Sequence, residues 1–218
     1  MEIVHRGHAC LDVTSRGMRV LIDPGSYSHV PSLAGVDALV LTHSHADHAD
    51  LEVARRVHHE SPQAVLLAPP DLAATWQAEG LPVEAVRPGT AVTIGTVALA
   101  FTGGRHAVVH RDLPVVDNVG VLVDGTLYHP GDSFDLPEAP VRVLAVPVSG
   151  PWLKLGEVLD FVAQVRASTV LPIHEVHLSE IGKRMVLARV EHVTAEYGGR
   201  FVTGRWQEST DKSPTSRD

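Results

Sequence analysis

Cysteine is almost absent from this chain. Cys10 is the only one, so no disulfide can form within a single chain. Long apolar runs are missing too, and no stretch approaches the roughly 18 apolar residues that a membrane-spanning helix needs. The opening residues MEIVHRGHAC lack the basic segment and apolar run of a signal peptide. We therefore expect a cytoplasmic protein with no membrane partner.

Clusters of basic residues are also missing. The chain carries 18 Lys and Arg against 26 Asp and Glu, which gives a formal net charge of -8. Proteins that bind nucleic acid through its phosphates need a basic surface. We therefore expect no nucleic-acid partner and a small-molecule substrate instead. The last residues, 207–218, are polar with Pro and Ser, and this composition predicts a disordered tail.

Strands and helices alternate along the rest of the chain. Its 218 residues are 44% apolar, which is enough for one large core. Apolar runs and turn residues predict strands or hairpins over 10–23, 37–43, 63–69, 91–104, 118–132, 142–148 and 169–174. Helical periodicity and capping residues predict helices over 71–80, 156–166 and 179–198. This pattern predicts one α/β domain over 1–206, with two sheets packed together and helices outside. Exposed sheet faces would allow a homo-oligomer.

Potential metal ligands gather where the predicted strands end. In LVLTHSHADHAD, residues 39–50, an apolar strand is followed at once by His43, His45, Asp47 and His48. Three further candidates also follow strands: His106, Asp132 and His174. A single histidine at a strand end is usually an ordinary polar residue, but four potential ligands within six positions form a much more specific pattern. Histidine nitrogen and carboxylate oxygen suit zinc, manganese or iron.

Seven candidate ligands are too many for one ion. A catalytic zinc site uses three protein ligands and keeps one position open. The number suits two ions that share one carboxylate. Such a pair acidifies a bound water and stabilises both the attacking and the departing oxygen. The ligand types therefore favour a two-metal hydrolytic centre.

These residues also resemble a known family. THSHADH, residues 42–48, matches the T-H-x-H-x-D-H signature of the metallo-β-lactamase superfamily. The family's later elements follow in order, with His106 in a Gly-rich loop, Asp132 in a GD turn and His174 after an apolar strand. VLIDPG, which contains Asp23, resembles the family motif that precedes the signature. The resemblance covers residues 2–206 and implies an αββα four-layer sandwich of two mixed sheets, with the site at one edge.

The resemblance implies a role for each candidate. One ion would be held by His43, His45 and His106, and the second by Asp47, His48 and His174. Asp132 would bridge the two ions, which makes Asp47 and Asp132 the expected catalytic carboxylates. A hydroxide between the ions would attack a carbonyl carbon or a phosphorus. Zinc is the expected metal, and manganese fits the same ligands.

Features of several other branches of the superfamily are missing from this sequence, and this narrows the choice of branch. Secreted zinc β-lactamases have a cysteine in place of Asp132, glyoxalase II adds a helical domain, and flavodiiron enzymes add a flavin domain. The segments VHRGHACLDV and YHPGDS most resemble the small L-ascorbate-6-phosphate lactonase-like group. We expect hydrolysis of an ester, lactone or amide of a small metabolite, anionic ones included. A phosphodiesterase is the alternative, and a mononuclear iron dioxygenase is a third, disfavoured by the complete second ligand set.

Six further residues are candidates for the pocket or for supporting the ligands. Asp23 is expected to brace the signature loop by accepting hydrogen bonds, because ligating histidines need their second N–H held. Lys154 could bind a phosphate or carboxylate, although a plain connection with a packing tryptophan is the more usual explanation of such a loop. The full set is His8, Asp23, His110, Trp152, Lys154 and His177.

Overall fold

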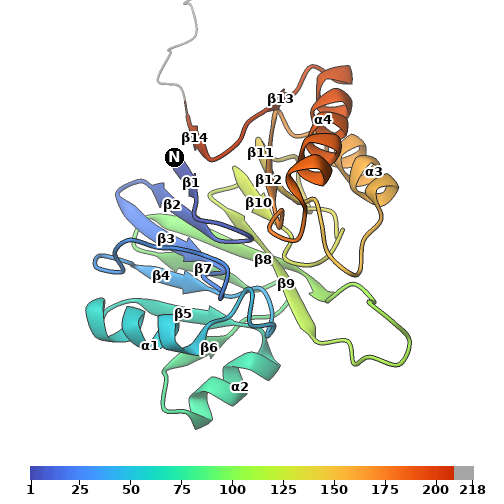
Figure 1. The fold of residues 1–218 in the computed structure, drawn as a ribbon. Helices are drawn as coiled ribbons and strands as arrows, with labels where there is room; N and C mark the ends of the chain where they lie inside the picture. Colours follow the sequence, from blue (N-terminus) through green and yellow to red (C-terminus); the bar gives the residue numbers. More distant parts are fainter. Residues whose placement is uncertain (209–218) are drawn as a thin grey trace, which may run out of the picture.

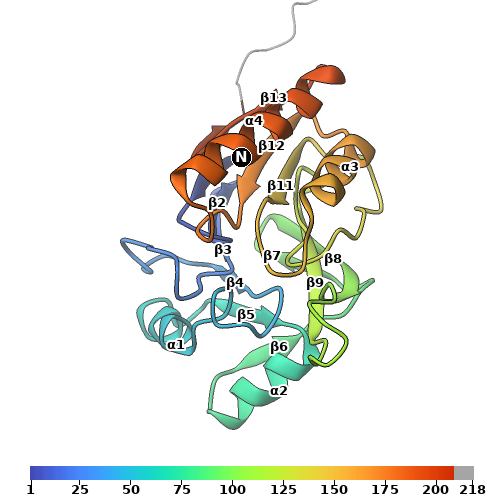
Figure 2. The ribbon, with the colours of Figure 1, turned by 45° about the vertical axis from the view of Figure 1, so that its right-hand side comes forward.

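The computed structural model describes residues 1–208, and two seven-stranded mixed sheets form its centre. The first sheet has the strand order β14-β1-β2-β3-β4-β5-β6, and the second has β13-β12-β11-β10-β9-β8-β7. One pair of helices lies beside each sheet, as Figure 1 and Figure 2 show. This is the predicted αββα sandwich, and the α/β fold class is confirmed.

The first sheet is built mainly from the first half of the chain. Strands β14, β1, β2 and β3 are antiparallel, and β3 to β6 are parallel. Helices α1 and α2 follow β4 and β5. The bounds are β1 Glu2–His5, β2 Leu11–Ser15, β3 Met18–Ile22, β4 Ala38–Val40, α1 Leu51–Glu60, β5 Val65–Ala68, α2 Pro70–Ala78, β6 Val83–Ala85 and β14 Arg205–Gln207.

The second sheet repeats this plan. Strands β7 to β10 are antiparallel and β10 to β13 are parallel. Helices α3 and α4 follow β11 and β12. The bounds are β7 Ala91–Ile94, β8 Val97–Arg105, β9 Asp117–Val123, β10 Leu127–His129, β11 Val143–Pro147, α3 Leu155–Val165, β12 Thr169–Ile173, α4 Glu180–Glu196 and β13 Arg200–Phe201.

Alternation of side chains along the strands divides the core into three apolar layers. In β4, Ala38 and Val40 join the layer between the two sheets, whereas Leu39 points to the layer under α1 and α2. The third layer packs α3 and α4 on the second sheet, with Phe161 at its centre. Because successive strand residues face opposite sides, one short strand contributes to two layers. Burial on both faces explains the nearly continuous apolar runs in the sequence.

The predicted helix over 179–198 agrees closely with α4. The Ser179 hydroxyl caps its first turn by accepting the N–H of Gly182 at 3.2 Å. Gly198, with φ +79°, follows the last helical turn. At the C-terminus, Gln207 still belongs to β14, and residues 209–218 of the predicted tail lie outside the described part of the chain. None of the helices within residues 1–208 is long and apolar enough to cross a membrane.

A buried carboxylate ties the β3–β4 loop to the first sheet. Asp12 accepts two hydrogen bonds from Arg19, at 2.9 and 3.0 Å, and two from Arg6, at 2.9 and 3.1 Å. Arg19 also donates to the carbonyl oxygens of Ser32 and Ala34. Burial alone would raise the pKa of Asp12, but the hydrogen bonds from Arg19 and Arg6 outweigh it and lower that pKa.

Replacing Asp12 with Asn should lower the free energy of unfolding by about 2 kcal/mol, because two arginines lose their charged acceptor. The folded-state pKa lies below the unfolded value of about 3.9, so this stabilisation is present above that value and is lost as pH falls through the folded-state pKa. Urea denaturation from pH 7 to pH 3 measures both effects. Asp160→Asn, which removes an exposed charge, should change little; equal effects of the two variants would refute the assignment.

Candidate metal centre

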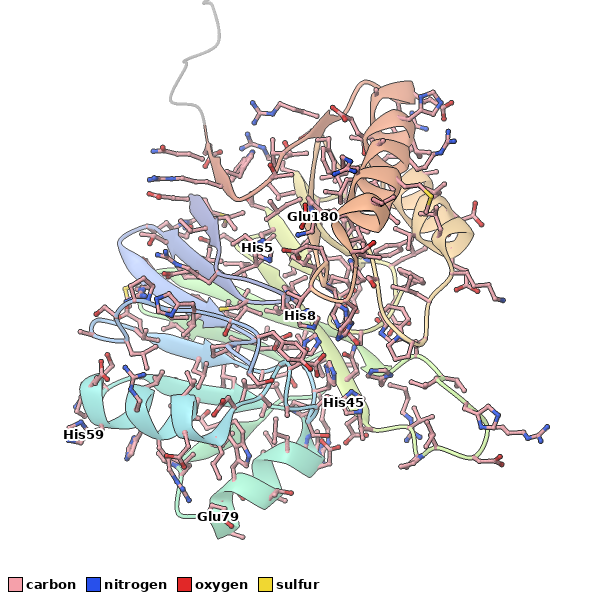
Figure 3. The ribbon with its side chains drawn as sticks, in the orientation of Figure 1. His5, His8, His45, His59, Glu79 and Glu180 are labelled. Atoms are coloured by element: carbon pink, nitrogen blue, oxygen red, sulfur yellow. The ribbon has the colours of Figure 1, made fainter. Side chains whose placement is uncertain are left out.

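The predicted ligands come from loops that follow β4, β8, β10 and β12, and they meet at one edge of the two sheets. Figure 3 shows His8 and His45 in this region, whereas His59 lies at the far end of α1. Strands β4, β10 and β12 belong to the parallel parts of their sheets, so their carboxyl ends face the same way within each sheet. The fold therefore brings together ligands that span more than 130 positions in the sequence.

The potential ligand atoms form three overlapping groups. The atoms within each group lie within 4.8 Å of one another, and the groups are His43, His45, His106; His43, His48, Asp132; and His8, Asp47, His48, His174. Asp132 stands between them. Its Oδ1 lies 3.2 Å from Nε2 of His48, and its Oδ2 lies 3.2 Å from Nε2 of His174 and 3.4 Å from Nε2 of His106. Ligands bound tetrahedrally at about 2.0–2.1 Å would be about 3.3 Å apart, so these spacings suit a shared cation.

Hydrogen bonds at the signature determine which ring nitrogen of His43 carries hydrogen. The Thr42 hydroxyl donates to Asp23 at 2.6 Å, so towards His43 Nδ1, 3.0 Å away, it can only accept. Nδ1 of His43 therefore holds the hydrogen, and its Nε2 presents a lone pair. The backbone N–H of Thr42 also donates to Asp23, at 2.7 Å.

The same logic applies to two other histidines. Nδ1 of His48 donates to the Asp23 carboxylate at 2.7 Å, and Nδ1 of His106 donates to the carbonyl of Ala107 at 2.5 Å. In the neutral form of each ring, Nε2 is left with a lone pair. Holding the second nitrogen of a ligating histidine fixes both its tautomer and its orientation. Asp23 thus serves two histidines of the signature at once.

Several buried polar atoms in this region have no hydrogen-bond partner among the described residues. They include Nε2 of His43, Nε2 of His106 and Oδ1 of Asp132. A buried acceptor without a partner costs about 1–3 kcal/mol, so native structures rarely keep one without a reason. Two lone pairs and a carboxylate oxygen require a cation or a donor. The donor set therefore fits one or more divalent metal ions.

The local electrostatics keep the ligands in their metal-binding forms. Burial lowers the pKa of His43 well below its usual value, and burial together with the nearby His106 lowers that of His45. Burial alone would raise the pKa of Asp132, but the neighbouring rings of His48, His106 and His174 outweigh it, so that pKa falls well below its usual value. His43 and His45 are therefore neutral, and Asp132 is ionised, near neutral pH.

His48 behaves in the opposite way. Burial alone would lower its pKa, but the carboxylates of Asp132 and Asp23 outweigh burial and raise it well above its usual value. A proton on this ring occupies the place where a cation would balance the same negative charge. Metal affinity should therefore fall as pH falls, because protons compete for the ligands.

Three residues of the site adopt left-handed backbone conformations. They are His8, Asp23 and His174, with φ of +53°, +47° and +67°. Non-glycine residues rarely adopt such angles, which cost of order 1–3 kcal/mol and persist where the surroundings enforce them. Strain of this kind gathers at functional sites. Hairpin turns elsewhere in the chain also use positive φ. At this edge, however, three such residues lie close together in separate loops.

Two glycines allow the loops to approach one another. A Cβ on Gly25 would lie 2.0 Å from the backbone of Asp47, and a Cβ on Gly131 would lie 2.2 Å from Oδ1 of Asn118. Gly131 also has φ +65°. These contacts give a physical reason for the glycines in the DPG and PGD segments.

Four of the six supporting candidates lie at or beside the ligand cluster. Nε2 of His8 lies 3.0 Å from Oδ2 of Asp47, and the indole Nε1 of Trp152 donates to Oδ2 of Asp132 at 2.7 Å. The exposed His177 borders the site, with its ring centroid 5.2 Å from that of His8. Asp23 holds the signature loop, as described above.

Two of the candidates are not brought to the cluster. The side chain of Lys154 is 86% exposed, and its ammonium lies 3.6 Å from Glu157 at the start of α3. His110 is also exposed and lies beside Asp112.

Sequence reasoning missed several residues that shape the site. Asn118 accepts the backbone N–H of Asp132 at 3.0 Å and donates to the carbonyl of Pro130 at 3.0 Å. Tyr27 packs edge-on against His8, with ring centroids 5.3 Å apart. Thr42 belongs to the signature, so its position could have suggested its role. Nothing in the local sequence around Asn118 or Tyr27 indicates theirs.

Comparison with known proteins decides the family. The family model described as "Beta-lactamase superfamily domain" matches residues 2–174. The chain belongs to the beta-lactamase superfamily. Protein Rv0786c of Mycobacterium tuberculosis is 33% identical to this superfamily member over 200 residues, covering 89% of this chain and 93% of that protein.

A second relative and a solved structure are also similar to this chain. A UPF0173 metal-dependent hydrolase of Exiguobacterium is 27% identical over 195 residues, which cover 80% of this superfamily member and 85% of the relative. The solved structure of Igni18, a metallo hydrolase from the archaeon Ignicoccus hospitalis, has the same fold, with a TM-score of 0.70 at 19% identity over 95% of this chain and 99% of that one.

Replacing Asp23 with Asn should weaken zinc binding by about 10- to 100-fold, because His43 and His48 lose the group that fixes their ring orientation. Competition with a chromophoric chelator measures the affinity. Asp160→Asn, at an exposed residue of α3 outside the ligand set, removes the same charge and should bind zinc normally. Unchanged affinity in Asp23→Asn would show that the bracing is dispensable.

Replacing Trp152 with Phe should keep the aromatic packing on Phe134, 5.0 Å away, while removing the N–H donated to Asp132. We expect zinc affinity to fall by about tenfold, since a hydrogen bond to a charged group is lost. Trp76→Phe, in the layer under α2, is the matched control and should lower stability without altering zinc affinity. Equal zinc affinities of the two variants would contradict the role of the indole N–H.

Proposed function

We propose that the chain is a dinuclear metal-dependent hydrolase that cleaves an ester, lactone or amide of a small metabolite. It is a metal-dependent hydrolase of the beta-lactamase superfamily, and its relatives carry the same description. The observation that carries the two-ion proposal is the number of donors at one edge. Eight side chains that can bind metal converge there, namely the seven proposed ligands and His8, and the rings of His43 and His106 present an unpartnered Nε2.

The donors divide into two sets around one carboxylate. His43, His45 and His106 would hold the first ion, and Asp47, His48 and His174 the second, with Asp132 shared between them. Two divalent ions, zinc or manganese, would supply an acidified water as nucleophile and a Lewis acid for the oxygen that gains charge. His and Asp donors are compatible with both metals.

The chain's own residues hold the two carboxylates in place. The Asp132 backbone N–H donates to Asn118 and its Oδ2 accepts the indole N–H of Trp152, which fixes the carboxylate, and its Oδ1 has no hydrogen-bond partner among the described residues. Asp47 is held by His8, and this hydrogen bond outweighs burial and lowers the pKa of Asp47. Both carboxylates are therefore ionised before a metal ion arrives.

Exposed apolar side chains lie in the loops that carry the donors. Of the seven large apolar residues that are exposed in residues 1–208, four lie in these loops, namely Val108, Leu113, Leu136 and Val176, and Tyr27 lies in the β3–β4 loop that carries Asp23. Exposed apolar groups that share one region usually mark a binding surface. The proposed substrate therefore presents an apolar group beside the bond that is cleaved.

Metal analysis and a substrate panel test this proposal together. Protein purified without chelator should contain about two zinc or manganese ions per chain. Removing the metal should abolish hydrolysis of an aryl ester or a lactone, and adding it back should restore hydrolysis. Asp132→Ala should lower the metal content and reduce kcat/KM by at least about 100-fold, because both ions lose a ligand. His59→Ala, an exposed residue at the end of α1, is the control.

Three outcomes would contradict the proposal. One ion per chain with full activity would refute the dinuclear centre. Turnover of phosphodiesters in preference to esters, lactones and amides would replace the proposed substrate class with the phosphodiesterase alternative. Oxygen-dependent activity that requires a single iron would indicate a dioxygenase instead.

A further inference from the structure

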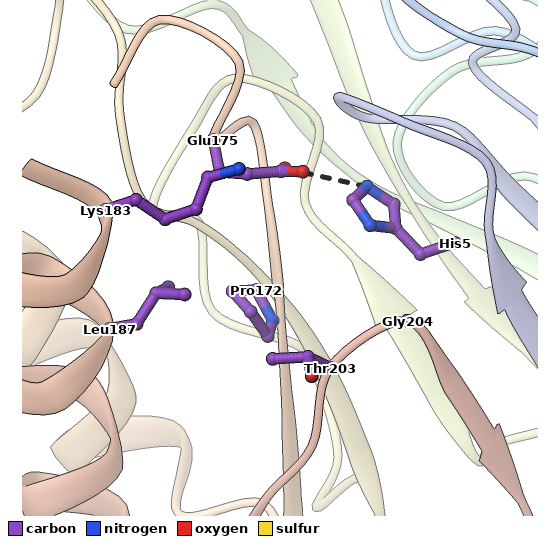
Figure 4. Close-up of a pocket in the computed structure, with 7 residues that line it drawn as sticks. All are labelled: His5, Pro172, Glu175, Lys183, Leu187, Thr203 and Gly204. Carbon is purple, nitrogen blue, oxygen red and sulfur yellow. Dashed lines mark ion pairs between the residues drawn. The ribbon is translucent and has the colours of Figure 1, made fainter. Parts of the chain in front are cut away.

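A separate cavity of about 400 Å³ lies next to the segment that carries His174. It is bordered by β1, β12, the first half of α4 and the link between β13 and β14 (Figure 4). Its lining residues are His5, Pro172, Glu175, Lys183, Leu187, Thr203 and Gly204. None of them is among the seven proposed metal ligands.

The cavity contains opposite charges that do not satisfy each other. Oε2 of Glu175 is buried and has no hydrogen-bond partner among the described residues. Nε2 of His5 lies 3.7 Å from this oxygen. That nitrogen donates to the carbonyl of His8 at 2.7 Å, so its hydrogen points elsewhere. Lys183 lines the same cavity, and no ion pair links it to Glu175 or to any other residue in 1–208.

The opposite end of the cavity is apolar. Figure 4 shows Glu175, Lys183 and His5 at one end, and Pro172, Leu187 and Thr203 at the other. Lys183 and Leu187 are one helical turn apart on α4 and face the cavity together. A cavity with an acid and a base at one end and apolar side chains at the other complements a ligand with both charges and an apolar group.

We propose that this cavity binds a small zwitterion, namely an α-amino acid with an apolar side chain. Its ammonium group would donate to Glu175, its carboxylate would accept from Lys183, and its side chain would pack on Leu187 and Pro172. Charge-assisted hydrogen bonds of this kind are about twice as strong as neutral ones, and the half-buried setting limits competition from water.

The cavity shares a wall with the metal centre. The carbonyl of His8 accepts the His5 ring N–H and also the backbone N–H of His174, at 2.7 and 2.8 Å. Glu175 directly follows His174 in the chain. A bound amino acid would therefore contact Glu175, the residue next to the proposed ligand His174.

Calorimetry on the metal-loaded protein tests the proposal with three matched probes. L-leucine carries both charges, N-acetyl-L-leucine lacks the ammonium, and L-leucinamide lacks the carboxylate. We expect L-leucine to bind at least about tenfold more tightly than either probe, since each probe loses one charge-assisted hydrogen bond. This comparison uses the unmodified protein, so it does not depend on any variant folding.

Two variants then assign each charge. Glu175→Gln should weaken L-leucine about tenfold and leave N-acetyl-L-leucine unchanged, and Lys183→Gln should weaken L-leucine equally and leave L-leucinamide unchanged. Glu191→Gln and Lys154→Gln are matched controls that alter exposed charges outside the cavity. Thermal unfolding and metal content check that each variant is folded and loaded.

Three results would overturn the proposal. The first is no heat of binding with L-leucine at about 10 mM, a concentration that would reveal a millimolar site. The second is equal affinity for all three probes. The third is L-leucine binding that neither variant weakens, which would place the amino acid on the metal ions instead.

Discussion

The carboxylate of Asp23 is the interaction on which the metal centre depends. It accepts the backbone N–H and the hydroxyl of Thr42 and the ring N–H of His48, and through the Thr42 hydroxyl it also fixes His43. It is fully buried, so these donors are its solvation. One side chain outside the proposed ligand set thus determines the ring orientation of a ligand in each of the two sets.

The two sheets place a carboxylate at equivalent points. Asp23 follows β3, the strand where the first sheet changes from antiparallel to parallel, and Asp132 follows β10, the corresponding strand of the second sheet. In the first half the order is Asp-Pro-Gly, and in the second it is Pro-Gly-Asp. The two carboxylates also differ in their surroundings. Asp23 accepts hydrogen bonds from protein donors, whereas Asp132 faces the histidine cluster.

Much of this arrangement could be predicted from the sequence, because it depends on local patterns. Apolar runs located the central strands, and the THSHADH segment located ligands that are consecutive in the chain. Asp23 could be placed because it directly follows a predicted strand. The contribution of Asn118 could not be predicted, since it depends on β9 lying beside the signature, where His43 and Asn118 form a bridge. Trp152 and Lys154 are two residues apart yet differ in position, because α3 begins immediately after Lys154 and turns its side chain to solvent.

The pairing of β14 with β1 joins the two ends of the described chain, with Glu2 opposite Gln207. During synthesis, β1 must therefore wait for residues 205–207 before its outer edge is covered. Every proposed ligand lies between residues 43 and 174 and leaves the ribosome earlier. Pairings of such long sequence separation form slowly, because the closure of a large loop precedes any gain from the contacts. All the proposed metal ligands are therefore synthesised before β14 can pair with β1 and complete the first sheet.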